Sequence, residues 1–472
     1  LGEDILSYAR ASGPVTVSLA SSTAVGAGND TVYGFEKVVG SNFGSMLIGD
    51  ANGNPIYGGA GDDTIQGGLG NDTLDGEGGI DAISYLNASG SVSVNLSLST
   101  STGAAGDDLI YRFSNIIGPN FASSLIGDSG DNVILGGSGD DTIDGGEGSD
   151  TLIAAGGGQG NLLIYSGLTS PVSVYLSLSG ASSGGDTDSL SGFRNVVGSS
   201  VSDLIEGDSS DNIIKGGLGD DTLVGGDGID TLNYADSTSS VTVNLCESSA
   251  VGGEGNDSIS GFENIIGPVY GSVLIGGLDN NSIIGGTGDD TIDGNQGSNT
   301  LIGGLGVNTI RYISGNEAVT INLLNSTAVT ASGNDTFSGF LNVVGSNLND
   351  SIIMGDQGHS IDGADGNDTV IVGLGQDTLQ GGNGSDTLVY TRVNSSITVD
   401  LAQQSSSGGA GIDYIYGFEN IIAPNSASCL IGDTSNNTII AGSGNDTVLG
   451  GNGLNSLDGG AGLNTLSYND HT

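Results

Sequence analysis

The chain has 472 residues with 89 glycines, and its 55 acidic residues against only 7 lysines and arginines give a formal net charge of −48. Glycine at this frequency without a three-residue period excludes a collagen helix, and so acidic a chain is a poor partner for nucleic acid or an anionic membrane. No apolar stretch approaches the roughly 18 residues of a membrane span, and the 36% of apolar residues recur at regular positions, which predicts a thin repetitive core.

A nine-residue glycine-rich motif, which we call a rung, recurs along the chain. It has the form G-G-x-G-x-D-x-U-x, in which U is a large apolar residue and the aspartate stands at position six. Two copies, 58–66 and 67–75, follow each other directly, and further copies occupy 136–144, 216–224, 252–260, 285–293, 381–389 and 408–416. One copy could be any glycine-rich turn, but many copies in one frame are a specific signal.

A longer repeat contains the rungs. Its phase is marked at intervals of 77, 80, 69, 78, 78 and 78 residues by Tyr8, Tyr85, Tyr165, Tyr234, Tyr312, Tyr390 and Tyr468. The sequence therefore predicts a single elongated solenoid over 1–472 with repeat units 8–84, 85–164, 165–233, 234–311, 312–389 and 390–467. Unit 165–233 is one rung shorter than the common length, since its run contains three rungs.

The elements of a unit follow one order. An alternating segment such as 92–96 predicts a half-buried strand. The Ser/Thr-rich stretches after it, at 97–102, 177–183, 325–332 and 403–407, are expected to bulge outward as loops. A lone rung, a short apolar segment and a run of rungs complete the unit. In each rung the glycine-rich residues predict a turn and the last three a short strand. The inward-pointing U residues include Ile65, Leu74, Ile83, Ile143, Leu223, Ile292, Leu388 and Val448.

Two rungs make one turn of the predicted fold, so that strands stack in parallel in two sheets. We therefore predict an all-β chain, a right-handed parallel β-roll or β-helix solenoid of about 25 turns and on the order of 120 Å in length. No segment has a helical period of useful length.

The position-six acids predict calcium sites. Calcium takes six to eight oxygen ligands, and two rungs on the same edge could supply carboxylates together with turn carbonyls. Asp63 should thus share a site with Asp81, and Asp368 with Asp386. The predicted ligands in the runs are Asp63, Asp72, Asp81, Asp141, Asp150, Asp221, Asp230, Asp290, Asp368, Asp377, Asp386 and Asp446. Those in the lone rungs are Asp30, Asp108, Asp188, Asp257, Asp335 and Asp413.

Asparagine often replaces this aspartate. It does so at Asn54, Asn132, Asn212, Asn281, Asn299, Asn308, Asn437, Asn455 and Asn464. An amide oxygen ligates calcium without contributing charge, and the asparagines could instead stack as amide ladders with no ion. We expect fewer or weaker sites around 276–311 and 450–467, and the best sites at 58–84 and 363–389. The alternative for any single aspartate is that it caps its own turn.

With these rungs the chain resembles the RTX, or haemolysin-type calcium-binding, repeat family over nearly its whole length. The segment 261–267, GFENIIG, resembles the spacer between such repeats in large bacterial surface and secreted proteins. The resemblance implies several bound Ca²⁺ ions, export of the unfolded chain, and folding outside the cell in millimolar calcium. The asparagine rungs and the insert in every run depart from the family pattern. These departures argue against a uniform row of calcium sites along the chain.

Three classes of function are open. The first is a structural protein of an extracellular filament, sheath or surface layer. The second is an adhesin stalk or the calcium-folding module of a larger secreted protein or enzyme. The third is an enzyme, which we do not expect, because calcium explains the acids and no nucleophile–histidine–acid set is recognisable.

The expected location is extracellular, at the cell surface. The expected partners are other copies of the chain, stacked head to tail or laterally, and cell-surface polysaccharide. Head-to-tail stacking is suggested by Tyr8 and Tyr468, which have the same phase in the unit. We expect no nucleic acid and no membrane insertion.

Overall fold

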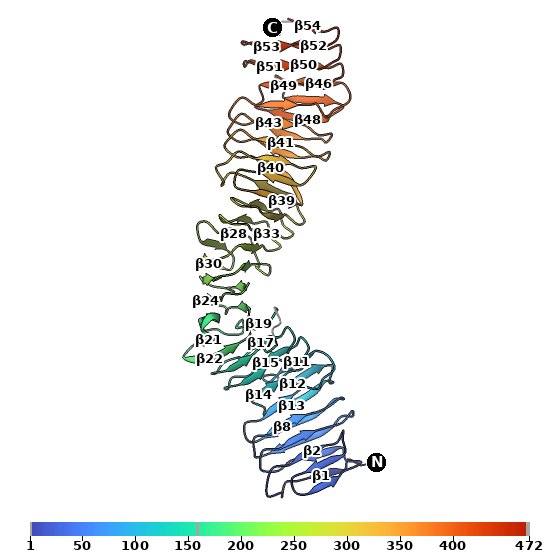
Figure 1. The fold of residues 1–472 in the computed structure, drawn as a ribbon, viewed down its shortest axis with the longest axis vertical. Helices are drawn as coiled ribbons and strands as arrows, with labels where there is room; N and C mark the ends of the chain where they lie inside the picture. Colours follow the sequence, from blue (N-terminus) through green and yellow to red (C-terminus); the bar gives the residue numbers. More distant parts are fainter. Residues whose placement is uncertain (1, 157–159, 469–472) are drawn as a thin grey trace. The chain divides into compact units, whose positions relative to one another are not determined.

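The computed structural model describes residues 2–156 and 160–468. Contacts divide the chain into two compact units, the first formed by Leu1–Leu232 with Gly255–Phe262 and the second by Asn233–Glu254 with Glu263–Thr472. Each unit is built from stacked coils of short strands (Figure 1). The predicted all-β β-roll is confirmed: the described residues contain a single helical turn, the 3₁₀ turn η1 (Leu176–Leu178). Among them no helix has the length and apolar character needed to cross a membrane.

The first unit contains two sheets. Sheet I consists of β1 (Ile5–Ser7), β5 (Lys37–Val39), β7 (Pro55–Gly59), β9 (Thr73–Glu77), β13 (Asp108–Tyr111), β12 (Thr100–Gly103), β11 (Val92–Asn95), β15 (Ser124–Ile126), β17 (Thr142–Asp144), β19 (Leu162–Ile164), β23 (Asn195–Val197), β25 (Ile213–Lys215) and β27 (Thr231–Asn233). Sheet II consists of β4 (Asn29–Thr31), β3 (Thr23–Val25), β2 (Thr16–Ser18), β6 (Met46–Ile48), β8 (Thr64–Gln66), β10 (Ala82–Ser84), β14 (Asn115–Ile117), β16 (Val133–Leu135), β18 (Thr151–Ile153), β22 (Asp186–Ser191), β21 (Gly180–Ser183), β20 (Val172–Tyr175), β24 (Leu204–Glu206), β26 (Thr222–Val224) and β30 (Gly255–Ser260).

The second unit also contains two sheets. Sheet III consists of β31 (Asn264–Ile266), β33 (Ser282–Ile284), β35 (Thr300–Ile302), β39 (Asn334–Ser338), β38 (Thr327–Val329), β37 (Thr320–Asn322), β41 (Ser351–Ile353), β43 (Thr369–Ile371), β45 (Thr387–Val389), β49 (Asn420–Ile422), β51 (Thr438–Ile440) and β53 (Ser456–Asp458). Sheet IV consists of β29 (Ser249–Gly252), β28 (Val241–Asn244), β32 (Val273–Ile275), β34 (Thr291–Asp293), β36 (Asn308–Arg311), β40 (Phe340–Val344), β42 (Ser360–Asp362), β44 (Thr378–Gln380), β48 (Gly411–Tyr416), β47 (Ser405–Gly408), β46 (Ile397–Asp400), β50 (Cys429–Ile431), β52 (Thr447–Leu449) and β54 (Thr465–Leu466).

The strand register confirms that two rungs make one coil. Strand β6 pairs in parallel with β8, and Leu47 faces Ile65, which lies 18 residues further along the chain. Successive strands alternate between the two sheets, because each glycine-rich turn reverses the direction of the chain across the roll. Rungs n and n+2 therefore lie on the same edge, as the sequence predicts.

The core is a column of U side chains in each sheet. In sheet II the column runs through Leu47, Ile65, Ile83, Ile116 and Ile134, which face one another on neighbouring strands and are completely buried. One apolar residue per rung is enough, since the two sheets close on each other across a narrow interior. The predicted inward residues are all buried, from Ile65 at 0% to Val448 at 3% exposure.

Each repeat unit adds an antiparallel insert to one sheet. Strand β11 pairs antiparallel with β12, and β12 pairs antiparallel with β13, so that three strands enter sheet I together. The outer two rejoin the parallel stack, β13 against β9 and β11 against β15. The opposite sheet receives no strand here: β10 pairs directly with β14, and Ile83 faces Ile116, 33 residues away instead of 18.

The expectation that the Ser/Thr-rich stretches bulge outward is wrong. Residues 100–103, 180–183, 327–329 and 405–408 form the middle strands β12, β21, β38 and β47 of the inserts. The turns before them are tight and contain residues with positive φ, such as Ser99 at 58° and Gln404 at 56°. Alternating Ser and Thr side chains are accepted in these strands because every second side chain of the insert faces solvent.

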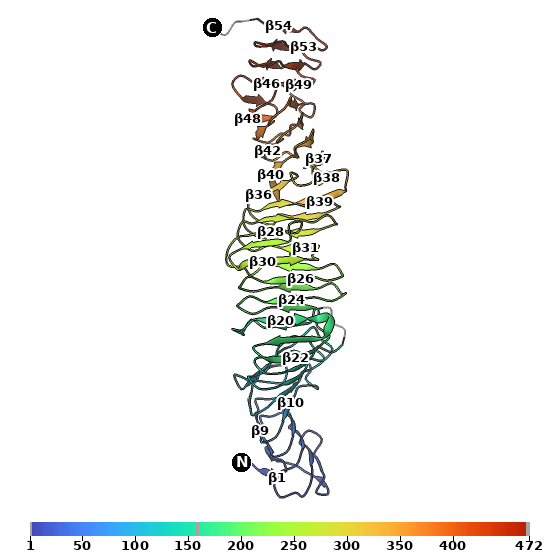
Figure 2. The same ribbon diagram turned by 90° about the vertical axis from the view of Figure 1, so that its left-hand side faces the viewer.

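Successive inserts alternate between the two sheets of the first unit. Strands β2–β4 belong to sheet II, β11–β13 to sheet I and β20–β22 to sheet II, and six single strands separate each insert from the next. Figure 2 shows β20 next to β24 in this stack. Only five strands, β23–β27, precede the next insert, and its β30 pairs with β26 in sheet II again. Loss of one rung thus changes the face on which an insert lies.

Candidate calcium-binding site

The position-six aspartates of the runs end each turn and point into the roll. The Oδ1 atom of Asp81 accepts the backbone N–H of Asp63 at 2.7 Å, and Oδ1 of Asp63 accepts that of Ser45 at 2.6 Å. The same bond, at 2.7–2.9 Å, is accepted by Asp72, Asp141, Asp150, Asp221, Asp230, Asp290, Asp368, Asp377, Asp386 and Asp446. One carboxylate oxygen is therefore used to join neighbouring coils.

The second carboxylate oxygen is buried without a hydrogen bond. This holds for the Oδ2 atoms of Asp63, Asp72, Asp81, Asp141, Asp150, Asp290, Asp368, Asp377, Asp386 and Asp446. All ten side chains are at most 2% exposed. A buried acceptor without a donor costs about 1–3 kcal/mol, and more when it is charged. A cation bound at these oxygens would remove this cost.

The first glycine of the rung allows two oxygens to approach its Cα closely. A Cβ atom on Gly58 would lie 2.4 Å from Asp63 Oδ2 and 2.6 Å from the carbonyl oxygen of Gly76 in the next coil. A Cβ on Gly363 would lie 2.4 Å from Asp368 Oδ2 and 2.3 Å from the Gly381 carbonyl oxygen. A carboxylate oxygen and a main-chain carbonyl oxygen thus lie close to each other beside this glycine, and these are the kinds of oxygen ligand that a hard cation prefers.

These residues fit calcium through a mixed set of ligands. Among the described residues no cluster of three or more acidic, histidine or cysteine side chains is close enough to hold a metal. The side chains alone are therefore too few, and the turn carbonyls must complete the coordination sphere. The pairs Asp63/Asp81 and Asp368/Asp386 lie on neighbouring coils, joined by the hydrogen bonds between them.

Burial also raises the pKa of these carboxyl groups. Loss of solvation raises the pKa of Asp72 and Asp368 to about 7, and that of Asp63 and Asp141 to about 6. The nearby backbone N–H donors act in the opposite direction but are outweighed. In the absence of a cation these carboxylates are therefore poorly accommodated as anions at neutral pH.

The aspartates of the lone rungs have different surroundings. The Oδ1 atom of Asp108 accepts the N–H of Asp72 at 3.0 Å, and its Oδ2 accepts the Tyr85 hydroxyl at 2.8 Å and Ser101 Oγ at 3.0 Å. Asp188 Oδ2 likewise accepts the hydroxyl of Tyr165 at 2.7 Å. Both carboxylate oxygens of Asp108 and of Asp188 thus have donors within the protein, which favours a structural role, and their assignment as calcium ligands stays a prediction.

The other lone-rung aspartates differ in their burial. Asp257, Asp335 and Asp413 are buried and accept a backbone N–H from the preceding coil, and Asp413 Oδ2 also accepts Ser406 Oγ at 2.6 Å. Asp30 is exposed and lies 3.3 Å from the Tyr8 hydroxyl. The calcium-ligand assignment of these positions stays a prediction, and their geometry favours it less than that of the runs.

Where asparagine stands at position six of the second rung after an insert, its side-chain amide donates to a main-chain carbonyl group. Asn132 Nδ2 donates to the Ser114 carbonyl at 2.8 Å, while its Oδ1 accepts the N–H of Asp128. Asn54, Asn212, Asn281 and Asn437 make the same pair of bonds. A carboxylate would repel the facing carbonyl, so asparagine at this position reflects the local hydrogen bonding.

The asparagines late in the runs donate hydrogen bonds to carbonyl groups of their own turns. Asn299 Nδ2 donates to the Gln296 carbonyl and Asn455 Nδ2 to the Asn452 carbonyl, while each Oδ1 accepts the coil-joining N–H. Asn308 and Asn464 also donate to carbonyls of their own turns. These amides occupy the carbonyls that would otherwise be free for calcium, which supports the expectation of fewer sites around 276–311 and 450–467.

Sequence reasoning missed several position-six residues. Asp203 and Asp350 occupy that position in the degenerate rungs 198–206 and 345–353, and their carboxylates accept a backbone N–H from Val172 and Val319. His359 takes the place of asparagine in rung 354–362. Its side chain is nearly buried, and its backbone N–H donates to Asp377 Oδ1 at 2.8 Å. Counting back in nines from the first glycines of the following rungs, Gly216 and Gly363, would have found all three.

A matched set of alanine variants separates calcium ligation from coil joining. Asp63→Ala, Asp368→Ala and Asn455→Ala each remove a side-chain acceptor for a backbone N–H. Only the aspartate variants also remove a buried, unpartnered Oδ2. We expect fewer calcium ions per chain and a lower melting temperature for the two aspartate variants, and unchanged calcium stoichiometry for Asn455→Ala. Equal calcium loss from all three, measured by equilibrium dialysis, would show that asparagine rungs are full sites.

Tyr85, which begins a repeat unit, should be structural. In Tyr85→Phe, Asp108 Oδ2 loses one of its two hydroxyl donors. We expect destabilisation of about 1–3 kcal/mol, since the remaining carboxylate is buried, with calcium stoichiometry unchanged. Tyr111→Phe is the control, because Tyr111 is partly exposed. Denaturant unfolding in saturating calcium measures the first effect, and a loss of bound calcium in Tyr85→Phe would contradict the structural role.

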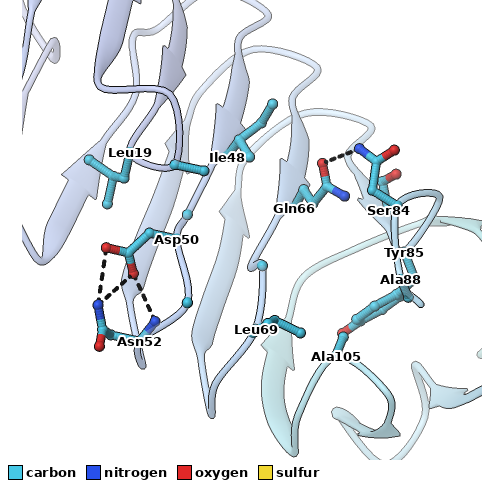
Figure 3. A pocket seen from close by; sticks show the side chains of 15 residues that line it. Leu19, Ile48, Asp50, Asn52, Gln66, Leu69, Ser84, Tyr85, Ala88 and Ala105 are labelled. Carbon is cyan, nitrogen blue, oxygen red and sulfur yellow. Dashed lines mark hydrogen bonds between the residues drawn. The ribbon is translucent and has the colours of Figure 1, made fainter. Parts of the chain in front are cut away.

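A groove of about 540 Å³ lies beside the turns of the first unit. Figure 3 shows Leu19, Ile48 and Leu69 along it, with Asp50 and Asn52 hydrogen-bonded to each other. Gln66 Oε1 accepts Asn87 Nδ2 at 3.2 Å. Its described lining residues include one acid, Asp50, and no histidine, cysteine or basic residue. The side chains of Asp50 and Asn52, and those of Gln66 and Asn87, are thus engaged with each other.

Comparison with known proteins agrees with the geometry of the turns. The family model of the RTX calcium-binding nonapeptide repeat matches residues 48–83, 124–158, 197–232, 249–263, 275–310, 360–394 and 431–466. These segments contain the runs of rungs, and most of the inserts lie between them. No curated protein matches the chain. The repeated turns, their convergent oxygens and this match together place the chain in the RTX calcium-binding nonapeptide repeat family, whose repeats bind several calcium ions.

Proposed function

We propose that the chain is a secreted structural protein that folds on binding calcium outside the cell and builds a filament, sheath or surface layer. The observation that carries the proposal is the row of buried Oδ2 atoms without donors, which makes the fold dependent on a cation. A chain that stays unfolded where calcium is scarce can pass a narrow export channel and then fold in external calcium. A fold made of repeated coils and inserts is suited to a structural role.

A recurring exposed side chain supports lateral assembly. In four repeat units the first rung after an insert has a large, exposed apolar residue at position four: Phe43, Phe121, Tyr270 and Leu348 are 44%, 45%, 47% and 41% exposed. They stand at equivalent positions of four repeat units, two in each compact unit, so a second copy of the chain could contact them in the same way at each of these positions. Exposed apolar side chains at repeated positions favour association between proteins.

Electron microscopy and light scattering of the purified chain, with calcium and with chelator, test the proposal. Long or sheet-like particles should form in calcium and disappear with chelator. The combined variant Phe43→Ser, Phe121→Ser, Tyr270→Ser and Leu348→Ser should keep its calcium-dependent circular dichroism and lose assembly. Folded particles that stay monomeric at high concentration in calcium would contradict the assembly and favour a module of a larger secreted protein.

A further inference from the structure

A column of outward side chains crosses three strands of sheet IV. Asp362 on β42 faces Gln380 on β44, and Gln380 faces Tyr416 on β48. All three stand at the ninth position of a rung and therefore point to the same side of the sheet. Tyr416 is 38% exposed, although tyrosine is large and mostly apolar. The column thus combines an aromatic ring, an amide and a carboxylate on one surface.

A second row of polar side chains runs beside this column. Asp365 and Asn383 lie on neighbouring turns, and Asn383 Nδ2 donates to Asp365 Oδ1 at 2.8 Å. Together with Asn347 they form the other wall of a groove of about 390 Å³, while Ala364, Gly382 and Gly417 leave its floor without large side chains. The three strands that carry the column span about 10 Å at the ordinary strand spacing.

The first unit shows what closes such a groove. Tyr57 on β7, Asp75 on β9 and Tyr111 on β13 are paired in the same register. The next residue there is Arg112, whose φ of 55° resembles the 63° of Gly417. The Arg112 guanidinium donates to both carboxylate oxygens of Asp75, with Nε 2.8 Å from Oδ1. Where Arg112 covers the column in the first unit, Gly417 leaves it open in the second.

The open groove has the chemistry of a sugar site. The face of a tyrosine ring can pack on the apolar face of a sugar ring. Amides both donate and accept hydrogen bonds and carboxylates accept them, which matches hydroxyl groups of either orientation. A chain with a net charge of −48 repels acidic polymers. We propose that the groove between Tyr416 and Asp365 binds a short segment of an uncharged polysaccharide. This goes beyond the proposed structural role and does not require self-assembly.

Affinity electrophoresis of the folded full-length chain in calcium tests this site. Native gels contain no polymer, a neutral glucan, glycol chitin or polygalacturonate. The wild type should be retarded in at least one of the two neutral polymers and not in polygalacturonate. Tyr416→Ala should weaken binding roughly two- to tenfold, as expected for loss of a stacking ring. Tyr414→Ala is the matched control, because Tyr414 lies on the same strand, is 54% exposed and does not line the groove.

A variant that covers the groove tests the site without removing Tyr416. Gly417→Arg combined with Gln380→Asp should reproduce the covered arrangement of Arg112 and Asp75 and abolish retardation while circular dichroism stays unchanged. The proposal is overturned if neither neutral polymer retards the wild type, if only polygalacturonate does so, or if Tyr416→Ala and Tyr414→Ala bind alike. Assembly in calcium is measured separately, so a failure here leaves the proposed structural function standing.

Discussion

In chelator the chain should be largely unfolded, and millimolar calcium should restore β-structure. Ten aspartates have a buried Oδ2 without a donor. At about 1–3 kcal/mol for each such group, their combined cost is on the order of 10 kcal/mol or more, whereas a folded domain is stable by only about 5–15 kcal/mol. Calcium removes this cost where it ligates the oxygens, and it stabilises the native state by mass action.

Circular dichroism with calcium titration measures this change, and magnesium is the matched control. Magnesium has the same charge but is smaller and gives up its water ligands reluctantly. Carboxylate–carbonyl sites for calcium should therefore respond weakly to magnesium at the same concentration. Equal folding in magnesium would show that simple charge neutralisation drives folding, and equal folding in chelator would contradict a role for any cation.

The rung pattern in the sequence was sufficient to predict the coil. A period of nine with one U residue per rung places Ile65 beside Leu47 and Ile83 and buries all three, and it places Asp63 beside Asp81. These are local consequences of repetition, because each residue contacts its equivalent 18 positions away. The position-six aspartates of the runs were predicted as a group for the same reason.

Two features could not be predicted from the nine-residue period: the strand pairing of the inserts, and the difference between the position-six residues of the runs and those of the lone rungs. A Ser/Thr-rich segment such as 97–102 has the composition of a loop, and only its pairing with β11 and β13 makes residues 100–103 a strand. The partner of Asp108 is Tyr85, 23 residues away, which no nine-residue period indicates. The use of asparagine at Asn132 depends on the Ser114 carbonyl that faces it in the folded coil.

The stability of the chain should depend on pH in opposite directions with and without calcium. Burial raises the pKa of Asp72, Asp150 and Asp368 to about 7. In an unfolded chain aspartate titrates near 3.9. Between these values the calcium-free folded state binds more protons than the unfolded state. Its stability is therefore greatest below the unfolded pKa and falls as pH rises through 6 to 7.

In calcium the sign is reversed. The ion binds the deprotonated carboxylates, so binding releases protons and becomes stronger as pH rises through the same interval. Chelated protein should gain β-structure when the pH falls from 8 to 5, which stays above the isoelectric point of about 4.1, whereas calcium-loaded protein should lose stability. Because protonation also reduces the net charge, a chelated sample at pH 8 in about 1 M salt, where the Debye length is about 3 Å, is the control. If salt alone restores the fold, general repulsion outweighs the buried aspartates. If the chelated chain is less folded at pH 5 than at pH 8, the raised pKa values are wrong.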